Sequence, residues 1–433
     1  MAAEEEPSRP SFLVVSDILY DIRLVNNPQD WAKVKCLRRE AYGCGEKGDL
    51  IVDGLTLYVR AGPEDAPHLH PSLCIGATRD VLSSVGSEID DDMAECFGRD
   101  ISLSGSIYTV AGDVVVLRVS FLAGHKSSDF RTYYLVYDST AAALFLLPHE
   151  LPHCNQLCTT FPLKVKVEDN NYSLVIMAES TPKHPYPVFL TWSPPPPTCE
   201  QHKLSNRNLG WRVSSHICDD ARSFQASVMF LHEGSAVWGD LGLGVMYCDW
   251  SQLNNNPHLL GPLLGKFKHL PTSCRTKRDI DDPPLAVYRN MGRVGNSIWF
   301  VMIKPSKRSP GETMVGVWTL DLLSTEGEWE ELSEFKMRSI WELDGFRDKR
   351  LPLTVPKFPI LRQQDHGILY MLLPDPSRGG GSYAHLVGIH LSSSHGHGHK
   401  RRLVMNRRLS IPWMCRPIVV DPDLFKTTHN MTV

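Results

Sequence analysis

Long apolar segments are absent from the sequence. A helix that crosses a bilayer needs about 20 consecutive apolar residues, and no run in this 433-residue chain approaches that length. The chain begins with Met-Ala-Ala-Glu-Glu-Glu, which is acidic where a secretory or organellar leader would be basic. We therefore expect a protein that works in the cytoplasm, the nucleus or both, with no membrane partner.

A large excess of charge is absent as well. The 45 Lys and Arg residues and 49 Asp and Glu residues leave a formal net charge of -4. Proteins that bind nucleic acid through its phosphates usually carry a basic excess, so we do not expect a nucleic-acid partner. One basic cluster runs from Lys400 to Arg408. It fits the solvated edge of a strand better than a nuclear-import signal, and the second interpretation stays open.

Paired cysteine motifs are also missing. The 11 cysteines are odd in number and scattered, and several lie inside apolar runs, as Cys74 and Cys248 do. Free thiols in a reducing compartment account for this pattern better than a disulfide framework does. Cys154 and Cys158 lie close to His153, but no cysteine pair with a two-residue gap occurs anywhere. Structural zinc usually takes two close ligand pairs, so we expect no zinc site.

Motifs for phosphate binding and nucleophilic catalysis are absent too. The sequence contains no Gly-x-x-x-x-Gly-Lys loop, no nucleophile elbow and no dinucleotide fingerprint. We therefore expect no catalytic residue, no bound metal and no cofactor.

One segment keeps an enzymatic alternative open. Residues 149–153 read His-Glu-Leu-Pro-His, the letters of the zinc-protease motif His-Glu-x-x-His. That motif needs both histidines on one helical face, whereas an interior proline such as Pro152 costs a helix about 3 kcal/mol. We therefore predict that His149 and His153 do not lie on a helix. A metal-dependent hydrolase that uses residues 149–158 remains the alternative to a protein without catalysis.

Short apolar segments bounded by Gly, Pro, Asn or Asp recur along most of the chain. Each unit has a strand, a loop, a second strand that often ends in aspartate, and a shorter outer strand, with a period of roughly 55 to 70 residues. Repeats of this kind are typical of β-propeller blades. We predict an all-β fold, an irregular β-propeller-like array of three- to four-stranded units, with packed β-sandwiches as the alternative. The clearest runs are 114–121, 133–138, 172–177, 188–192, 297–303, 315–321, 367–373 and 386–391.

The predicted domain organisation is simple. Residues 1–10 are acidic and contain proline, which predicts a disordered tail. Residues 11–425 are expected to form a single propeller-like domain, followed by a C-terminal tail over 426–433. Within that domain, residues 31–41 are the best candidate for a helix.

The segment from Ser235 to Trp250 has the clearest pattern and predicts a tight hairpin. Two apolar runs flank Gly242 and Gly244, and glycine permits the backbone conformations that such turns need. Both faces of the second strand are largely apolar, which is typical of a strand packed between neighbouring sheets. Asp240 stands where the first strand meets the turn, so its carboxylate should accept backbone N–H groups.

This hairpin resembles the signature of a plant family known as DUF1618, which is expanded in grasses. The family pattern has Trp-x-Asp-Leu, then Gly, an aliphatic run and Cys-Asp, and residues 235–375 are the part most similar to it. Because the family has no assigned reaction, the resemblance implies no catalytic residue, and we expect the matching residues to be structural. They are Trp238, Asp240, Leu241, Gly244, Cys248 and Asp249.

The repeated units are also similar to the propellers that follow F-box domains in ubiquitin-ligase adaptors. An adaptor-like role is therefore a further alternative, although no Leu-Pro-rich helical segment precedes the first strand. From these features together we expect a non-catalytic platform that binds a protein or peptide partner through its loops.

Overall fold

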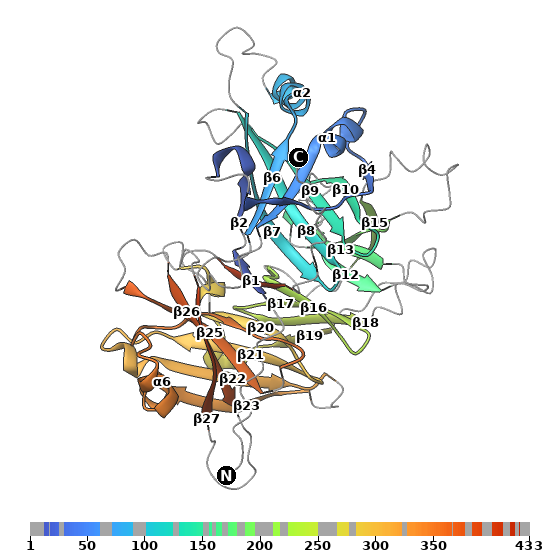
Figure 1. The fold of residues 1–433 in the computed structure, drawn as a ribbon. Coiled ribbons are helices and arrows are strands. Elements are labelled where there is room, and N and C mark those ends of the chain that lie inside the picture. Colours follow the sequence, from blue (N-terminus) through green and yellow to red (C-terminus); the bar gives the residue numbers. More distant parts are fainter. Residues whose placement is uncertain are drawn as a thin grey trace. The chain divides into compact units, whose positions relative to one another are not determined.

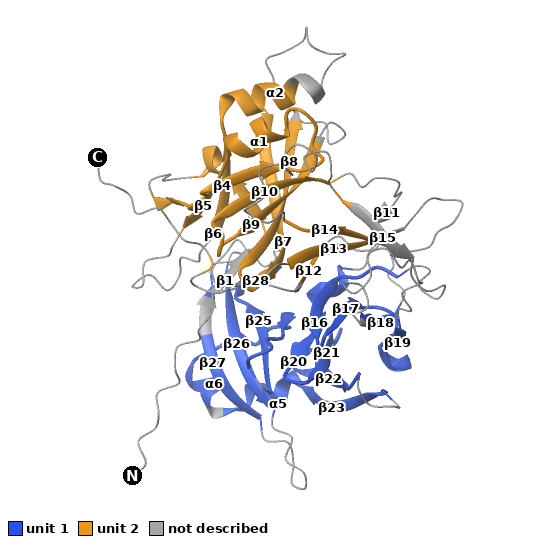
Figure 2. Cartoon of the chain, turned by 90° about the vertical axis from the view of Figure 1, so that its right-hand side faces the viewer, with its two compact units in different colours: residues 1–10, 216–416 blue, residues 11–215, 417–433 orange. Residues whose placement is uncertain are grey.

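The computed structural model is built mainly of β-strands (Figure 1). The chain divides into two compact units, residues 1–10 with 216–416 (unit 1) and residues 11–215 with 417–433 (unit 2) (Figure 2). No helix in the described part of the chain is long and apolar enough to span a membrane. The structure describes residues 13–16, 18–25, 30–60, 72–89, 101–123, 130–149, 156–157, 162–166, 172–179, 187–194, 211–216, 224–249, 266–276, 283–322, 327–365, 367–376, 383–391, 401–409, 416–420 and 424.

Unit 1 contains three successive four-stranded antiparallel sheets. Their first strands begin at Val228, Arg289 and Lys357, which agrees with the period read from the sequence. The predicted all-β array of four-stranded units is therefore confirmed in this part of the chain. The strands are β16 (Val228–His232), β17 (Ser235–Asp240), β18 (Gly244–Asp249), β19 (Lys266–His269), β20 (Arg289–Val294), β21 (Ser297–Lys304), β22 (Met314–Leu320), β23 (Trp329–Lys336), β24 (Lys357–Ile360), β25 (Ile368–Pro374), β26 (Ala384–Leu391) and β27 (Arg401–Leu409).

Short helices lie in the connections between these strands. They are η4 (Thr272–Cys274), η5 (Leu285–Val287), η6 (Pro310–Glu312), α5 (Met337–Trp341) and α6 (Asp344–Asp348).

Strand β21 shows how the sheets of unit 1 pack. Its side chains alternate between two cores because successive residues of a strand point to opposite faces. Ile298 and Phe300 join the core shared with the first sheet. Val301 and Ile303 join the core shared with the third sheet. A central strand buried on both faces explains the near-continuous apolar run in the sequence.

Unit 2 contains a nine-stranded sheet with the order β3-β5-β6-β2-β7-β8-β9-β10-β4. It also contains a five-stranded sheet with the order β11-β13-β14-β15, in which β12 pairs with β13 as well. A separate pair joins β1 to β28. The strands are β1 (Leu13–Ser16), β2 (Ile18–Asp21), β3 (Ala32–Lys33), β4 (Arg38–Ala41), β5 (Leu55–Arg60), β6 (Ser72–Ala77), β7 (Ile101–Ala111), β8 (Val114–Ala123), β9 (Phe130–Asp138), β10 (Ala143–Pro148), β11 (Gln156–Leu157), β12 (Leu163–Lys166), β13 (Tyr172–Glu179), β14 (Pro187–Trp192), β15 (Arg212–His216) and β28 (Pro417–Val420).

The two faces of the nine-stranded sheet are covered differently. Val115 and Leu117 on β8 pack in the core that includes residues of the helices α1 (Gly48–Gly54) and α2 (Arg79–Ile89). Val114 and Val116 face the opposite way and pack with strands β13 and β14 of the five-stranded sheet. The neighbour of each β8 side chain thus follows from its position in the alternation.

The helix predicted over residues 31–41 is wrong. This segment forms β3, which pairs with β5, and β4, which pairs in parallel with β10. Between them, Val34 N–H donates to Leu57 O and Leu37 N–H donates to Ala142 O. The segment therefore bonds to both edge regions of the nine-stranded sheet, and those distant pairings outweigh a local apolar spacing that fits a helix.

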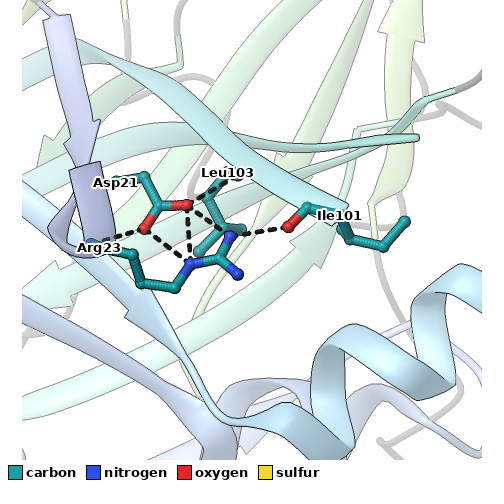
Figure 3. Close-up of polar contacts among 4 residues, drawn as sticks. All are labelled: Asp21, Arg23, Ile101 and Leu103. Atoms are coloured by element: carbon teal, nitrogen blue, oxygen red, sulfur yellow. Dashed lines mark hydrogen bonds and ion pairs between the residues drawn. The ribbon is translucent and has the colours of Figure 1, made fainter. Parts of the chain in front are cut away.

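The side chain of Asp21, at the end of β2, links this strand to β7 (Figure 3). Its buried carboxylate accepts from Leu103 N–H at 3.2 Å and from Arg23 N–H at 2.9 Å, and Arg23 also forms an ion pair with it. The Arg23 guanidinium donates onward to Ile101 O at 2.7 Å. Burial raises the pKa of Asp21, but these hydrogen bonds outweigh it and leave the pKa below its ordinary value.

The predicted tails, residues 1–10 and 426–433, lie outside the described residues. The single propeller-like domain predicted over residues 11–425 stays a prediction.

Candidate functional site

The predicted hairpin over the signature segment is present. Strands β17 and β18 pair antiparallel, with Trp238 opposite Met246 and Asp240 opposite Gly244, and residues 241–243 form the turn. Trp238 is 0% exposed, and Met246 and Cys248 are buried on the same side of the hairpin. Val237 and Val245 are buried on the other side, in the core shared with the second sheet. Both faces of the hairpin are therefore buried.

Asp240 makes the backbone contacts expected of it. Its carboxylate accepts from the N–H groups of Gly242 at 2.7 Å, Leu243 at 3.1 Å and Gln225 at 2.9 Å. The first two donors belong to the turn, and the third belongs to the segment that precedes β16. Burial raises the pKa of Asp240, while the three N–H donors and the nearby Arg289 act in the opposite direction. The side chain thus fixes the turn from inside the fold.

Arg289 completes this corner. It opens β20, and its guanidinium donates to Leu241 O at 2.8 Å and to Cys274 O at 2.7 Å. Leu241 lies in the turn between β17 and β18, and Cys274 lies in η4. The Arg289 side chain therefore links this turn and η4 to strand β20 of the second sheet. Burial lowers the pKa of Arg289, and the neighbouring Cys274 and Asp240 oppose that shift.

Gly244 is needed because another backbone segment passes close to it. A Cβ atom on Gly244 would lie 2.3 Å from Lys268 O and 3.0 Å from His269 Cα, both on the partner strand β19. Such contacts are too short for any side chain, so the strand pairing itself selects glycine. Leu241 is fully buried, and Asp249 ends β18 opposite Ser235.

A second cluster of polar and aromatic residues lies in unit 2. His149 follows β10 directly, outside any helix, and its ring stacks on Tyr134 with the ring centroids 5.0 Å apart. Burial lowers the pKa of His149 to about 4, and the positive charge of Arg118 adds to the effect. Its imidazole is therefore neutral near pH 7.

The rest of the His-Glu-x-x-His segment cannot be placed beside His149. Residues 150–155 and Cys158 lie outside the described residues, so the prediction for His153 stays a prediction. Among the residues that the structure does describe, no group of three or more His, Cys, Asp or Glu side chains could hold a metal ion.

Residues 238–370 match the family described as "Protein of unknown function (DUF1618)". The match covers less than a third of the 433-residue chain. The match begins at Trp238 in β17 and ends at Tyr370 in β25, so it contains the Asp240 turn, Arg289 and the whole second sheet. The predicted resemblance is therefore confirmed over this stretch. No curated protein matches the chain.

Solved structures are only distantly similar to the chain. A Bacillus subtilis levansucrase in complex with oligosaccharides has 10% identity and a TM-score of 0.30, over 73% of this chain and 89% of that chain. The Hadza microbial sialidase Hz136 has 9% identity and a TM-score of 0.30, over 73% and 60%. An exo-1,5-alpha-L-arabinanase from a bovine ruminal metagenomic library has 9% identity and a TM-score of 0.26, over 69% and 97%. These TM-scores are too low to support a conclusion about the fold or the activity of the chain.

The described cysteines are free thiols. They are Cys36, Cys44, Cys74, Cys248 and Cys274. Burial raises the pKa of Cys44 and Cys74 to about 12, so both are protonated and unreactive near neutral pH.

The basic cluster is part of a strand where it is described. Arg401 to Leu409 form β27, and the Arg401 guanidinium lies 4.6 Å from the centroid of the Phe335 ring. Lys400 lies outside the described residues. The interpretation as a strand is thus confirmed, while a role in nuclear import is untested.

Two features of the site were missed by the sequence reading. Arg289 carried no signal beyond being a charged residue between Tyr288 and Asn290. The Arg118 and Tyr134 pair carried none, because only the register of β8 against β9 brings the two residues opposite each other.

Proposed function

We propose that this protein is a non-catalytic platform that binds a protein or peptide partner. Its main support is the way the signature uses its polar groups. The Asp240 carboxylate accepts hydrogen bonds from three backbone N–H groups, and the Arg289 guanidinium donates hydrogen bonds to two backbone carbonyls. Groups held in this way stabilise a scaffold and do not reach a substrate. Recognition then belongs to residues outside the signature.

Unit 2 offers candidate contact residues. Leu24, after β2, is 76% exposed and Leu37, before β4, is 73% exposed. Leu24 ends the short 3-10 helix η1 (Ile22–Leu24), and Leu37 lies in the connection between β3 and β4. Large apolar side chains exposed on such connections gain most from being covered by a partner.

Affinity purification with surface variants tests this proposal. The wild-type protein is compared with the double variant Leu24→Asp, Leu37→Asp, which should melt within a few degrees of wild type because exposed positions tolerate substitution. We expect a partner that binds wild type at a fixed ratio and is lost from the double variant. A partner recovered equally by both proteins would place recognition elsewhere.

The hydrolase alternative has a separate readout. Metal analysis of protein purified without a histidine tag, combined with a peptide-hydrolysis assay, decides it. Stoichiometric zinc together with turnover that His149→Ala abolishes would replace the platform by the enzyme. We also propose that the protein acts in the cytoplasm or nucleus, which the free thiols of its described cysteines support.

A further inference from the structure

The connection between β21 and β22 carries a serine within a sequence of the kind that protein kinases recognise. Residues 307–310 read Lys-Arg-Ser-Pro. A hydroxyl residue also precedes proline at Thr181 and Ser193, but only Ser309 comes directly after basic residues. Basic side chains and proline next to a hydroxyl are features by which kinases select their substrates. Ser309 is therefore a candidate for modification.

The connection presents this sequence at the surface. Lys307, Arg308 and Pro310 are exposed, and Ser309 is half-buried. The backbone of Ser309 is extended, with φ -155° and ψ 138°, which is the conformation that a following proline favours. Its hydroxyl oxygen accepts a long hydrogen bond of 3.4 Å from Gly311 N–H. This contact uses a lone pair of the oxygen and not the hydroxyl hydrogen.

Basic side chains gather around Glu312, which follows Ser309 in the same connection. The Glu312 carboxylate forms ion pairs with Lys336 at 2.6 Å and with Arg338 at 3.1 Å. Lys336, Arg338 and Arg308 together hold the pKa of Glu312 below its ordinary value. Three cations thus act on one carboxylate, so a second anion at this place is attracted by the remaining positive charge.

Printed contacts lead from the Ser309 hydroxyl to the Arg338 side chain in two steps. The hydroxyl contacts Gly311 N–H, and a Cβ atom on Gly311 would lie 3.6 Å from the Cβ atom of Arg338. The backbone fixes the same arrangement, because Met337 N–H at the start of α5 donates to Thr313 O, just after η6, at 2.9 Å. A group attached to Ser309 therefore lies beside the basic end of α5.

We propose that Ser309 is phosphorylated by a proline-directed serine kinase and that Arg338 and Arg308 bind the phosphate. In the reaction the Ser309 hydroxyl oxygen attacks the γ-phosphorus of ATP, its proton passes to the catalytic carboxylate of the kinase, and ADP leaves. The phosphate carries a charge of about -1.5 to -2 at pH 7 and accepts charge-assisted hydrogen bonds from guanidinium groups. It therefore fastens the β21–β22 connection to α5. This modification is independent of the contact residues Leu24 and Leu37 proposed above.

Incubation of the native full-length protein with a proline-directed kinase and ATP tests the site. Mass spectrometry should find phosphate on Ser309, and Ser309→Ala should lose it. Pro310→Ala should slow the reaction at least about tenfold, because the kinase pocket selects proline. The matched control is Ser339→Ala, which removes a serine that follows a basic residue but precedes isoleucine, and it should react like wild type.

A synthetic peptide of residues 303–314 serves as the accessible reference for this experiment. A native protein that takes up no phosphate at Ser309 overturns the proposal, and the peptide then shows whether the folded connection or its sequence is the reason. The proposal is equally wrong if Pro310→Ala reacts at the rate of wild type.

The binding of the phosphate has a readout of its own. Phosphorylated wild type should melt about 2 °C or more above the unmodified protein, because the phosphate gains hydrogen bonds from arginine. Arg338→Gln should lose most of this rise, whereas Arg347→Gln, an exposed arginine of α6, should keep it. An equal rise in Arg338→Gln, or a lower melting temperature after phosphorylation, would contradict the role proposed for Arg338.

Discussion

At the scale of single residues, Asp240 is the residue whose chemistry matters most for stability. Its carboxylate is the acceptor for three backbone N–H groups that the turn and the segment before β16 would otherwise leave unpaired. We expect Asp240→Ala to lower the free energy of unfolding by about 2 to 4 kcal/mol. Asp240→Asn should cost about half as much, because one oxygen still accepts from Gly242 and Leu243. Urea denaturation measures both, and an equal cost for exposed Asp80→Ala would contradict the account.

Asp21 should make stability depend on pH in the acid range. Its folded-state pKa lies below the ordinary 3.8 because Arg23 and Leu103 donate to the ionised form. The unfolded chain therefore binds the proton more readily, so the contribution of Asp21 is present at neutral pH and is lost as pH falls below about 4. The difference in unfolding free energy between wild type and Asp21→Asn should shrink between pH 6 and about pH 3. A difference that stays constant over this range would show that the Asp21 charge is not involved.

At the scale of elements, the pairing of β18 with β19 depends on Gly244. The nearest atoms to an added Cβ are backbone atoms of β19, which cannot rotate away as a side chain would. Gly244→Ala should therefore force the strands apart and cost about 2 kcal/mol or more. Gly345→Ala in α6 is the matched control, because its Cβ would lie 3.6 Å from Leu403 in ordinary contact. If both variants melt alike, close strand approach is not the reason for glycine at position 244.

The elements also show which parts of the fold the sequence could reveal. The hairpin of β17 and β18 was predictable because its glycines, its alternation and Asp240 all lie within 16 residues. The segment 31–41 was misread because its partners β5 and β10 lie far away in sequence. Exposed Leu37 shows that the apolar spacing there does not mark a buried helical face. Local patterns identify turns and strands, whereas pairing partners depend on the whole sheet.

The cluster of polar and aromatic residues in unit 2 could not be predicted from local patterns for the same reason. Arg118 reads as one charge in an apolar strand, and Tyr134 reads as one aromatic residue in another. Only the register between β8 and β9 makes them neighbours, and only the packing of Trp211 and His149 makes the place aromatic. His149 was noticed for its motif, yet its observed contact is with a ring.

At the scale of the whole molecule, cysteine chemistry tests the expected compartment. We expect all 11 cysteines to be free, as the described ones are. Alkylation of the unreduced native protein should be slow, because burial raises the thiol pKa values of Cys44 and Cys74 to about 12. After denaturation without reductant, mass spectrometry should find every cysteine labelled. A pair that is labelled only after reduction would reveal a disulfide and an oxidising environment.

The central claim is that the DUF1618 signature builds the scaffold and does not contact a partner. Trp238 is its largest side chain and is 0% exposed. Its truncation should leave a large cavity, at a cost of about 3 to 5 kcal/mol. The most direct test is the thermal melt of Trp238→Ala beside that of Leu353→Ala, whose side chain is 59% exposed. The account predicts a much lower melting temperature for Trp238→Ala and an unchanged one for Leu353→Ala. A Trp238→Ala protein that melts like wild type but no longer binds a partner would contradict it.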